Sequence, residues 1–381
     1  MKNDLMLFLL VFLFFFASRV SFFFIPIYLA ELNFTGFEIG LLVGLSSVAA
    51  FIAFFPSGFV NDKKSVKKPL LLSFILLSAF YSGITFFSGF IAFFALFLFG
   101  GIGLKVGTNS LRNYFLKSSP QGKEGNTMGL YKLVVMLGVF CGVLVVSVLV
   151  PVFEFNLVLQ GVSFLFILLI FFLFFFKDIK SSDVKVFQYK DDFLKKNILF
   201  FSLILFLFTL HWGAESTSYG LFLQEFFNLD FFQMGLYMAL PLPFLGFSAY
   251  YFGKKVDAKK IDFLSLFAVG VLLSGLTHIL MTFNPIEFSF LMRVIHEFAD
   301  GMVEIGLIFW IFRSFDFKRL AGNASLIMTV TVLGELIGAV VFSTIGGIYG
   351  YNWPFILTGI TSIMAAGLFL IYKKKYAERG N

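Results

Sequence analysis

The stretch Gly58-Phe-Val-Asn-Asp-Lys-Lys-Ser-Val-Lys-Lys68 separates two long apolar runs, at about 36–60 and 69–87. A helix of about 20 consecutive apolar residues crosses the roughly 30 Å hydrocarbon core of a bilayer. Each run has about that length, and the charged stretch between them must lie outside the hydrocarbon. These residues predict two membrane-spanning helices joined by a short basic loop.

The rest of the chain repeats this pattern. Hydrophobic residues make up 59% of the 381 positions and charged residues 13%, about half the charged share of soluble domains. This composition excludes a water-soluble enzyme and a disordered chain, and the continuous apolar runs exclude a strand barrel, whose strands alternate. We expect twelve spans, at about 5–30, 36–60, 69–87, 90–112, 126–150, 155–177, 197–224, 232–253, 263–283, 287–313, 322–348 and 351–372.

The basic residues predict the orientation of these spans. Most of the 29 Lys and Arg lie in the termini and in alternate loops. In the opposite loops the charged residues are all acidic, such as Glu31 and Glu154. Because basic loops resist translocation, the basic side is cytoplasmic. We therefore expect both termini to lie in the cytoplasm. We also expect the protein to lie in the inner or plasma membrane. The net charge of +7 reflects this topology, with some attraction to anionic lipid headgroups, and does not indicate nucleic-acid binding.

An internal repeat predicts the domain organisation. The polar segment 178–196 divides the chain into 1–177 and 197–381, and short patterns of the first part return in the second. The matched pairs are Gly58 and Asp62 with Gly253 and Asp257, Gly125-Asn126 with Gly322-Asn323, and Gly138-x-x-x-Gly142 with Gly334-x-x-x-Gly338. We expect an all-α membrane protein of two pseudo-symmetric six-helix bundles, joined by a cytoplasmic linker and present as a monomer.

The basic loop that begins at Gly58 also carries a family resemblance. Gly58, Asp62, Lys63, Lys67 and Lys68 resemble the Gly-x-x-x-Asp-Arg/Lys-x-Gly-x-Arg/Lys-Arg/Lys motif of the major facilitator superfamily. Ser65 stands where the family has its second glycine, and the second copy keeps only Gly253 and Asp257. The resemblance implies transport by alternating access, with the first, fourth, seventh and tenth helices lining a central cavity.

The same motif suggests a gate. We expect Asp62 to face either a helix N-terminus or a basic partner such as Arg112, while the lysines hold the loop at the headgroups. Such a latch closes the cytoplasmic side in one conformation and opens in the other.

The tenth span concentrates ionisable residues. A charged side chain at the bilayer centre costs about 2.5–3.5 kcal/mol on insertion scales, so it usually faces a cavity or a partner. With 3.6 residues per turn, one stripe of this helix carries Arg293, His296, Glu297, Asp300 and Glu304. This face is therefore predicted to point away from lipid.

Other spans add candidates. His211 and Glu215 lie in the seventh span, and His278 and Glu287 are interpreted as interfacial residues without a special role. Lys105 of the fourth span could confront the acidic stripe. The residues that we expect to line the substrate cavity are Arg19, Lys105, Asn109, Lys132, Tyr219, Arg293 and Glu335.

Three interpretations of these charges stay open. They could be structural ion pairs that hold helices in register. The basic groups, Arg19 first among them, could bind an anionic or zwitterionic solute through paired hydrogen bonds. We favour the third, in which buried carboxylates load protons and couple transport to a proton gradient. The expected proton carriers are Asp300, Glu297, Glu304 and Glu215, with His296 and His211 as relays.

No pattern indicates a cofactor or catalysis. The three histidines lie on separate stretches, Cys141 is the only cysteine, and no Gly-x-x-x-x-Gly-Lys-Ser/Thr loop is present. The sequence therefore predicts a secondary transporter of a small organic solute, with no metal, no ATP-hydrolysing site and no enzymatic activity. The alternatives are an exporter of amphiphilic drugs or a lipid flippase, and, outside transport, a membrane receptor or sensor.

Overall fold

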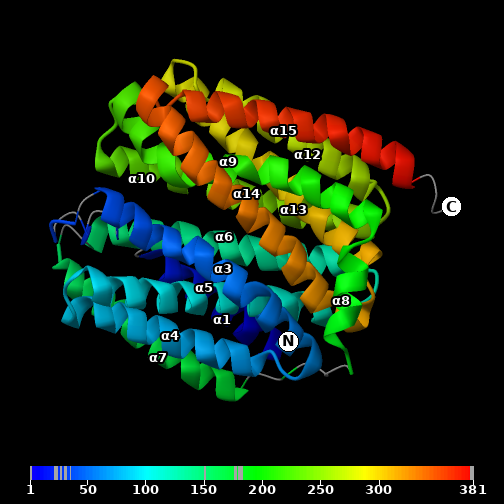
Figure 1. Cartoon of the computed structure of the whole chain (residues 1–381), viewed down its shortest axis with the longest axis horizontal. Coiled ribbons are helices and arrows are strands. Elements are labelled where there is room, and N and C mark those ends of the chain that lie inside the picture. Colours follow the sequence, from blue (N-terminus) through cyan, green and yellow to red (C-terminus); the bar gives the residue numbers. More distant parts are fainter. Residues whose placement is uncertain are drawn as a thin grey trace. The chain divides into compact units, whose positions relative to one another are not determined.

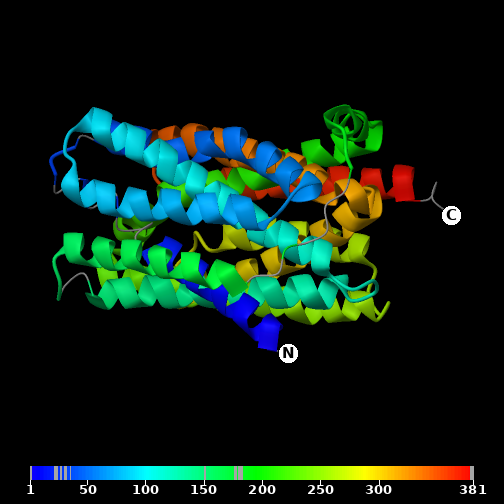
Figure 2. The same cartoon turned by 90° about the horizontal axis from the view of Figure 1, so that it is seen from below.

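The computed structural model describes residues 2–20, 25, 28–29, 32–34, 36–149, 152–175, 178 and 183–377. Within these ranges every regular element is a helix, as both ribbon views show (Figures 1 and 2). The chain forms two compact units. Unit 1 comprises Met1–Ser118, Val134–Val184 and Lys318–Ser325, and unit 2 comprises Ser119–Leu133, Lys185–Phe317 and Leu326–Asn381.

Unit 1 is built around α5. Its helices are α1 (Lys2–Val20), α3 (Gly36–Lys63), α4 (Lys67–Phe86), α5 (Phe90–Ser118), the later part of α6 (Glu124–Leu149) and α7 (Phe155–Phe172), which η1 (Leu173–Phe175) extends. α3 and α4 both pack on α5, and α7 packs on α4 and α1. The rings of Phe14, Phe74 and Phe166 meet in the core where α1, α4 and α7 converge.

Unit 2 is built around α12 and α13. Its helices include α8 (Val186–Phe193), α9 (Lys196–Phe227), α10 (Phe231–Ala239), α11 (Leu242–Asp257), α12 (Phe263–Leu280), α13 (Ile286–Ser314), α14 (Leu320–Tyr349), α15 (Trp353–Tyr372) and η3 (Lys373–Ala377). The short η2 (Phe317–Arg319) precedes α14, whose first residues belong to unit 1. α12 packs on α13 and α15, α9 on α15, and α11 on α13.

Among the residues that the structure describes, eight helices are long and apolar enough to cross a membrane, so the prediction of a multi-spanning membrane protein is confirmed. They are Lys67–Phe86, Phe90–Ser118, Glu124–Leu149, Phe155–Phe172, Lys196–Phe227, Phe263–Leu280, Phe317–Tyr349 and Trp353–Lys375. The count of twelve spans stays a prediction. The expected eighth span is divided into α10 and α11 at Leu240-Pro241, because proline lacks the N–H that a continuous helix needs at that position.

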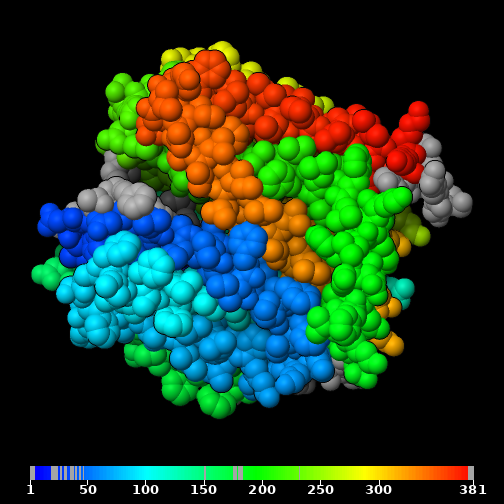
Figure 3. All heavy atoms as spheres, viewed as in Figure 1, coloured from blue at the N-terminus to red at the C-terminus, as the bar shows by residue number. Residues whose placement is uncertain are grey.

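The linker 178–196 is not wholly a loop, because it holds α8. Phe187 on this helix is 79% exposed, and Val186 and Leu194 are also exposed. Lys185, Lys190 and Lys195 are exposed beside these apolar side chains. Figure 3 shows the α8 segment, in green, at the surface. An apolar and basic surface of this kind suits the headgroup region of a bilayer.

The predicted repeat appears in how each unit packs its glycines. In unit 1, a Cβ atom on Gly138 or Gly142 of α6 would lie 2.7 Å from the carbonyl oxygen of Phe12 or 2.6 Å from that of Phe16, both on α1. In unit 2, a Cβ on Gly334 of α14 would lie 2.6 Å from the carbonyl oxygen of Phe206 on α9, and Gly338 approaches Leu210 there in the same way. Matching glycine pairs thus bring matching helices into backbone contact.

Candidate functional site

The charged stripe of α13 lies buried in unit 2, against α9 and α12. Asp300 receives hydrogen bonds from Ser274 Oγ of α12 at 2.7 Å and from Trp212 Nε1 of α9 at 3.3 Å. Its Oδ2 atom also lies 3.4 Å from His211 Nε2. Asp300 therefore contacts both neighbouring helices.

Arg293 joins the other two carboxylates of this site. Its guanidinium forms ion pairs with Glu215 of α9 and with Glu297 one turn further along α13. The guanidinium carbon also stands 4.8 Å from the centre of the Tyr219 ring, a distance at which the aromatic face attracts a cation. The buried set thus holds three carboxylates, those of Glu215, Glu297 and Asp300, but only one permanently positive group.

Three imidazole rings complete the network. His296 of α13 places Nε2 at 3.3 Å from Glu215 Oε1 and at 4.0 Å from Asp300 Oδ2. The ring centres of His211, His278 and His296 lie 4.9–5.4 Å from one another. We call these residues the charge network: His211, Glu215, His278, Arg293, His296, Glu297 and Asp300.

The interpretation of His278 as an interfacial residue is wrong. Its ring is fully buried against the other two histidines and against Phe355 of α15. Counting residues along α12 places His278 near a helix end, but the packing of α12 on α13 turns that end toward the network. Ser274, one turn earlier on α12, was also missed. It donates to Asp300, and its backbone carbonyl oxygen lies 3.1 Å from His296 Nδ1.

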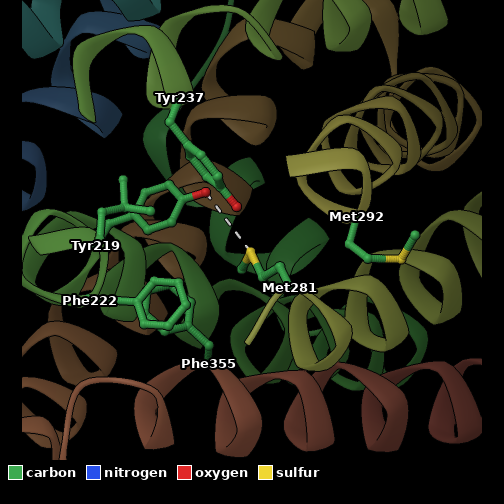
Figure 4. Packing of buried hydrophobic residues seen from close by; sticks show 7 residues of the cluster. Tyr219, Phe222, Tyr237, Met281, Met292 and Phe355 are labelled. Carbon is green, nitrogen blue, oxygen red and sulfur yellow. Dashed lines mark hydrogen bonds between the residues drawn. The ribbon is translucent and has the colours of Figure 1, made fainter. Parts of the chain in front are cut away.

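An aromatic layer packs beside the network. Tyr219, Phe222, Tyr237, Met281 and Phe355 form one buried cluster, and the hydroxyls of Tyr219 and Tyr237 point toward Met281 (Figure 4). The Tyr219 hydroxyl donates to the Met281 sulfur at 3.9 Å, while the Tyr237 hydroxyl lies 2.7 Å from Ser289 Oγ. Tyr219 also contacts Arg293, so this layer packs directly on the charge network.

One part of the network has the spacing of a metal site. A donor atom from each of His211, Glu215 and His296 lies within 4.8 Å of the other two. The sequence did not predict this group because the histidines are far apart along the chain. Only the packing of α9 on its neighbours in unit 2 brings them together.

Glu304, two turns after Glu297, belongs to a separate pair. Its Oε1 lies 2.6 Å from Nζ of Lys132, which stands on the part of α6 that belongs to unit 2. The two side chains are 22% and 17% exposed. Glu335 of α14 is half-buried, with no hydrogen-bond or ion-pair partner among the residues that the structure describes.

The motif loop of unit 1 forms an anchor at Asp62. The carboxylate accepts hydrogen bonds from the backbone N–H groups of Ala321 at 3.2 Å and Gly322 at 2.7 Å, at the start of α14. Lys117 of α5 forms an ion pair with Asp62 at 3.0 Å, and neither side chain is exposed by more than 1%. A carboxylate at a helix N-terminus is stabilised by the free N–H groups and the helix dipole.

Unit 2 has a matching anchor at Asp257. Its two oxygens accept from the N–H groups of Gly125 at 2.9 Å and Asn126 at 2.7 Å, at the start of α6. Burial raises the pKa of Asp257, and Glu124 adds to this effect while the two N–H donors oppose it. The sequence had paired Gly125-Asn126 with Gly322-Asn323, and the structure places each pair at a helix start beside its anchor.

The remaining predicted residues take several positions. The Asn109 amide donates to Phe54 O, Ser57 Oγ and Ser325 Oγ within unit 1, and Arg112 donates to Asn109 at 3.2 Å. The Lys105 ammonium stands 6.0 Å from the centre of the Phe54 ring. Lys63 lies over Phe59, whereas Lys67 and Lys68 begin α4. The side chain of Arg19 lies outside the described residues, so its predicted role stays a prediction.

Comparisons with known proteins agree with this architecture. The profile of the Major Facilitator Superfamily matches residues 7–284. Among solved structures, the human organic anion transporter MFSD10 (TETRAN) is similar in fold, with a TM-score of 0.79 and 14% sequence identity over 97% of this chain and 99% of the other. A search of curated protein sequences gives no match. The family profile covers well over half of the chain, which therefore belongs to the Major Facilitator Superfamily and is a membrane transporter.

Proposed function

We propose that the protein is a secondary active transporter that moves a small organic solute by alternating access, driven by protons. Its twelve spans would place both termini in the cytoplasm and the protein in the inner or plasma membrane. The single observation that supports binding and movement of a charged species is the charge network of unit 2. A receptor or sensor gains no support from any described element.

The composition of the network argues against a purely structural role. A buried ion pair is stable only when its charges are matched, because desolvation of each ion costs several kcal/mol. Three carboxylates face one guanidinium here, and the two nearest histidines are neutral unless they bind protons. The network therefore has an excess of negative charge and is suited to receive positive charge from outside the protein.

The two anchors support alternating access. Asp62 and Asp257 each bind the start of a helix that continues into the other unit, since α14 begins in unit 1 and α6 begins in unit 2. Release of a carboxylate from these N–H groups would free the helix start. We infer that the anchors hold one conformation and open in the other, as in the latch that the sequence predicts.

We assign proton coupling to Glu304. Of the predicted carriers on α13 it is the most exposed, so a proton can reach it. Protonation would remove its ion pair with Lys132 and so loosen α6 from α13. The other predicted carriers, Glu215, Glu297 and Asp300, are held in the buried charge network.

The test uses proteoliposomes that contain a pH-sensitive dye. Organic cations, zwitterions and anions are added in turn, and we expect one class to cause proton movement into or out of the vesicles. Glu304→Gln should abolish this proton movement and solute accumulation, while solute exchange continues. Glu287→Gln, on the same helix but at its exposed N-terminal end, is the matched control and should behave as wild type.

Two results would count against the assignment. Proton movement by Glu304→Gln at the wild-type rate would move the coupling site elsewhere. Solute flux that ignores the pH gradient in the wild type would remove proton coupling altogether.

The similar protein MFSD10 is an organic anion transporter. At 14% identity the likeness supports the fold alone. The negative excess of the charge network does not favour an anion in unit 2, so we do not extend that substrate to this chain.

A further inference from the structure

We propose that the charge network binds one divalent transition-metal ion, held by His211, Glu215 and His296 with Asp300 as a further ligand. The inference rests on the proposed function only in that the charge network binds positive charge. It does not depend on transport or on Glu304. Four features of the network support it, namely the distances, the histidine orientation, the charge and the supporting hydrogen bonds.

The distances fit a coordination shell. Zinc bonds to histidine nitrogen and carboxylate oxygen are about 2.0–2.2 Å long, which places tetrahedral ligand atoms about 3.3–3.6 Å apart. His296 Nε2 lies 3.3 Å from Glu215 Oε1, and His211 Nε2 lies 3.4 Å from Asp300 Oδ2. The third edge, from His296 Nε2 to Asp300 Oδ2, is 4.0 Å. Two of these three distances already have the length that a bound ion requires, and the donor atoms of His211, Glu215 and His296 all lie within 4.8 Å of one another.

The histidines are oriented as metal ligands are. His211 Nδ1 lies 2.5 Å from the carbonyl oxygen of Phe208, and His296 Nδ1 lies 3.1 Å from that of Ser274. A carbonyl oxygen only accepts, so Nδ1 must carry the hydrogen in both rings, and in the neutral ring Nε2 carries the free lone pair. Metal-binding histidines almost always use the second nitrogen in this way.

Both Nε2 atoms are buried and have no hydrogen-bond partner among the described residues. Their nearest polar neighbours are carboxylate oxygens, which also carry lone pairs. In each pair, two acceptors that face each other at 3.3–3.4 Å repel, and either a proton on Nε2 or a metal ion between the two atoms removes this repulsion. The structure therefore leaves a position for a cation between α9 and α13.

The charge of that cation follows from the network itself. With neutral histidines, the carboxylates of Glu215, Glu297 and Asp300 and the guanidinium of Arg293 leave two negative charges. One divalent ion balances them. The mixed nitrogen and oxygen donors favour Zn²⁺, Co²⁺ or Ni²⁺ over Mg²⁺ and Ca²⁺, which prefer oxygen ligands alone.

Neighbouring side chains hold the ligands in place. Ser274 and Trp212 donate to Asp300, and Arg293 donates to Glu215. His278 lies next to both ligand histidines, and neither of its ring nitrogens has a hydrogen-bond partner among the described residues. Hydrogen bonds such as those from Ser274, Trp212 and Arg293 normally fix the ligands of a metal site and tune its affinity.

The experiment titrates purified full-length protein in detergent with Co²⁺, with Zn²⁺ as the competitor. A polyhistidine tag would bind Co²⁺ itself and obscure a site built from two of the chain's three histidines, so purification must use a tag without histidine. We expect one Co²⁺ per chain by equilibrium dialysis, a visible absorption band from the bound ion, its displacement by Zn²⁺, and no displacement by Mg²⁺. Trp212 fluorescence should change on binding, and the change should be absent in Trp212→Phe.

Two variants test the ligands directly. His211→Ala and Glu215→Gln should each weaken Co²⁺ binding at least tenfold, because each removes one of the four proposed ligands. Glu287→Gln is the matched control and should bind as wild type. Since a ligand variant can fail to fold, each is first checked by size-exclusion chromatography, and the wild-type stoichiometry and Trp212 response stand as independent measurements.

The proposal is overturned if wild-type protein does not bind Co²⁺ or Zn²⁺. It is also overturned if His211→Ala and Glu215→Gln bind as wild type, since binding would then lie elsewhere. Metal binding without proton movement would contradict the proposed proton coupling and leave the metal site intact. Proton-coupled transport by a protein that binds no metal would contradict the metal site and leave the proton coupling intact.

Discussion

Asp62 and Asp257 hold a helix start in two different ways. Each carboxylate accepts two backbone N–H groups, Asp62 from α14 and Asp257 from α6. Asp62 is fully buried and paired with the equally buried Lys117. Asp257 is only partly buried, and the charged side chain that most affects its pKa is the like-charged Glu124 rather than a lysine.

The difference shows what burial demands of an anchor. A fully buried carboxylate needs a counter-charge as well as the helix N-terminus, because N–H groups alone do not replace its lost hydration. A partly exposed carboxylate keeps some water and can do without the lysine. The Asp62 anchor is therefore expected to be strong and sensitive to loss of one partner, and the Asp257 anchor to be weaker and easier to release.

The largest expected effect comes from Asp62→Asn. This change leaves the Lys117 ammonium, whose side chain is 1% exposed, without its counter-charge. Removal of one partner from a buried ion pair typically costs about 3–5 kcal/mol. We expect a clear drop in the thermal unfolding temperature in detergent, together with loss of transport.

A double variant separates the ion pair from the anchor. Asp62→Asn with Lys117→Met removes both charges, so most of the lost stability should return. Transport should stay low, because the asparagine offers one acceptor oxygen in place of the two that bind Ala321 and Gly322. Equal stability of the single and double variants would show that Lys117 does not compensate Asp62.

These anchors also show which contacts of Asp62 can be predicted from the sequence and which cannot. The Gly58 and Asp62 motif and its copy at Gly253 and Asp257 predicted that Asp62 would face a helix N-terminus or a basic partner, and it meets both. Lys117 was missed because the predicted span ends at Arg112, whereas α5 continues to Ser118. The thickness of the hydrocarbon core sets the length of the apolar run, but the helix can continue beyond that run. The additional residues of α5 bring Lys117 to Asp62.

The charge network was predicted in part, for a related reason. Helical periodicity gathers Arg293, His296, Glu297 and Asp300 onto one face of α13, and the structure buries that face. Periodicity within one helix cannot show which neighbouring helix packs against it. His278 of α12 and its contact with His296 were therefore missed, as was the meeting of all three imidazoles.

A smaller effect is expected from the glycines beside the anchors. A Cβ on Gly253 would come within 2.7 Å of the carbonyl carbon of Gly125, and its other two close neighbours are also backbone atoms. A Cβ on Gly58 would overlap the Ser325 hydroxyl and lie 2.7 Å from Ser325 Cβ and 2.9 Å from Ala321 O, so only one of its three close neighbours is a backbone atom. Overpacking typically costs about 1–3 kcal/mol, so we expect Gly253→Ala to lie in that range and Gly58→Ala to cost less.

Gly44→Ala is the control for both glycine variants. It lies within α3, where an added Cβ has no neighbour within 4 Å, so alanine should stabilise the helix slightly. Thermal unfolding of the three variants in detergent shows which variant loses the most stability and which the least. A larger loss in Gly58→Ala than in Gly253→Ala would mean that the Asp62 anchor, and not the Asp257 anchor, has the less adaptable backbone contact.

The smallest effect is expected from Asp257→Asn, and its sign depends on pH. Burial raises the pKa of Asp257 above the ordinary aspartate value, so the folded protein holds this proton more tightly than the unfolded chain does. The stability that the group contributes is then complete below the ordinary pKa and is lost as pH rises through the raised pKa. Asparagine does not ionise, so the unfolding temperature of wild type relative to Asp257→Asn should fall as pH rises across this window.

At neutral pH we expect wild type and Asp257→Asn to differ by less than about 1 kcal/mol, because asparagine keeps one of the two acceptor oxygens and water can replace the other at this partly exposed helix start. Thermal unfolding of both proteins in detergent across the pH window measures the difference. A difference that instead grows in favour of wild type with rising pH would mean that the N–H groups of Gly125 and Asn126 outweigh burial. The two anchors would then be electrostatically alike despite the missing lysine.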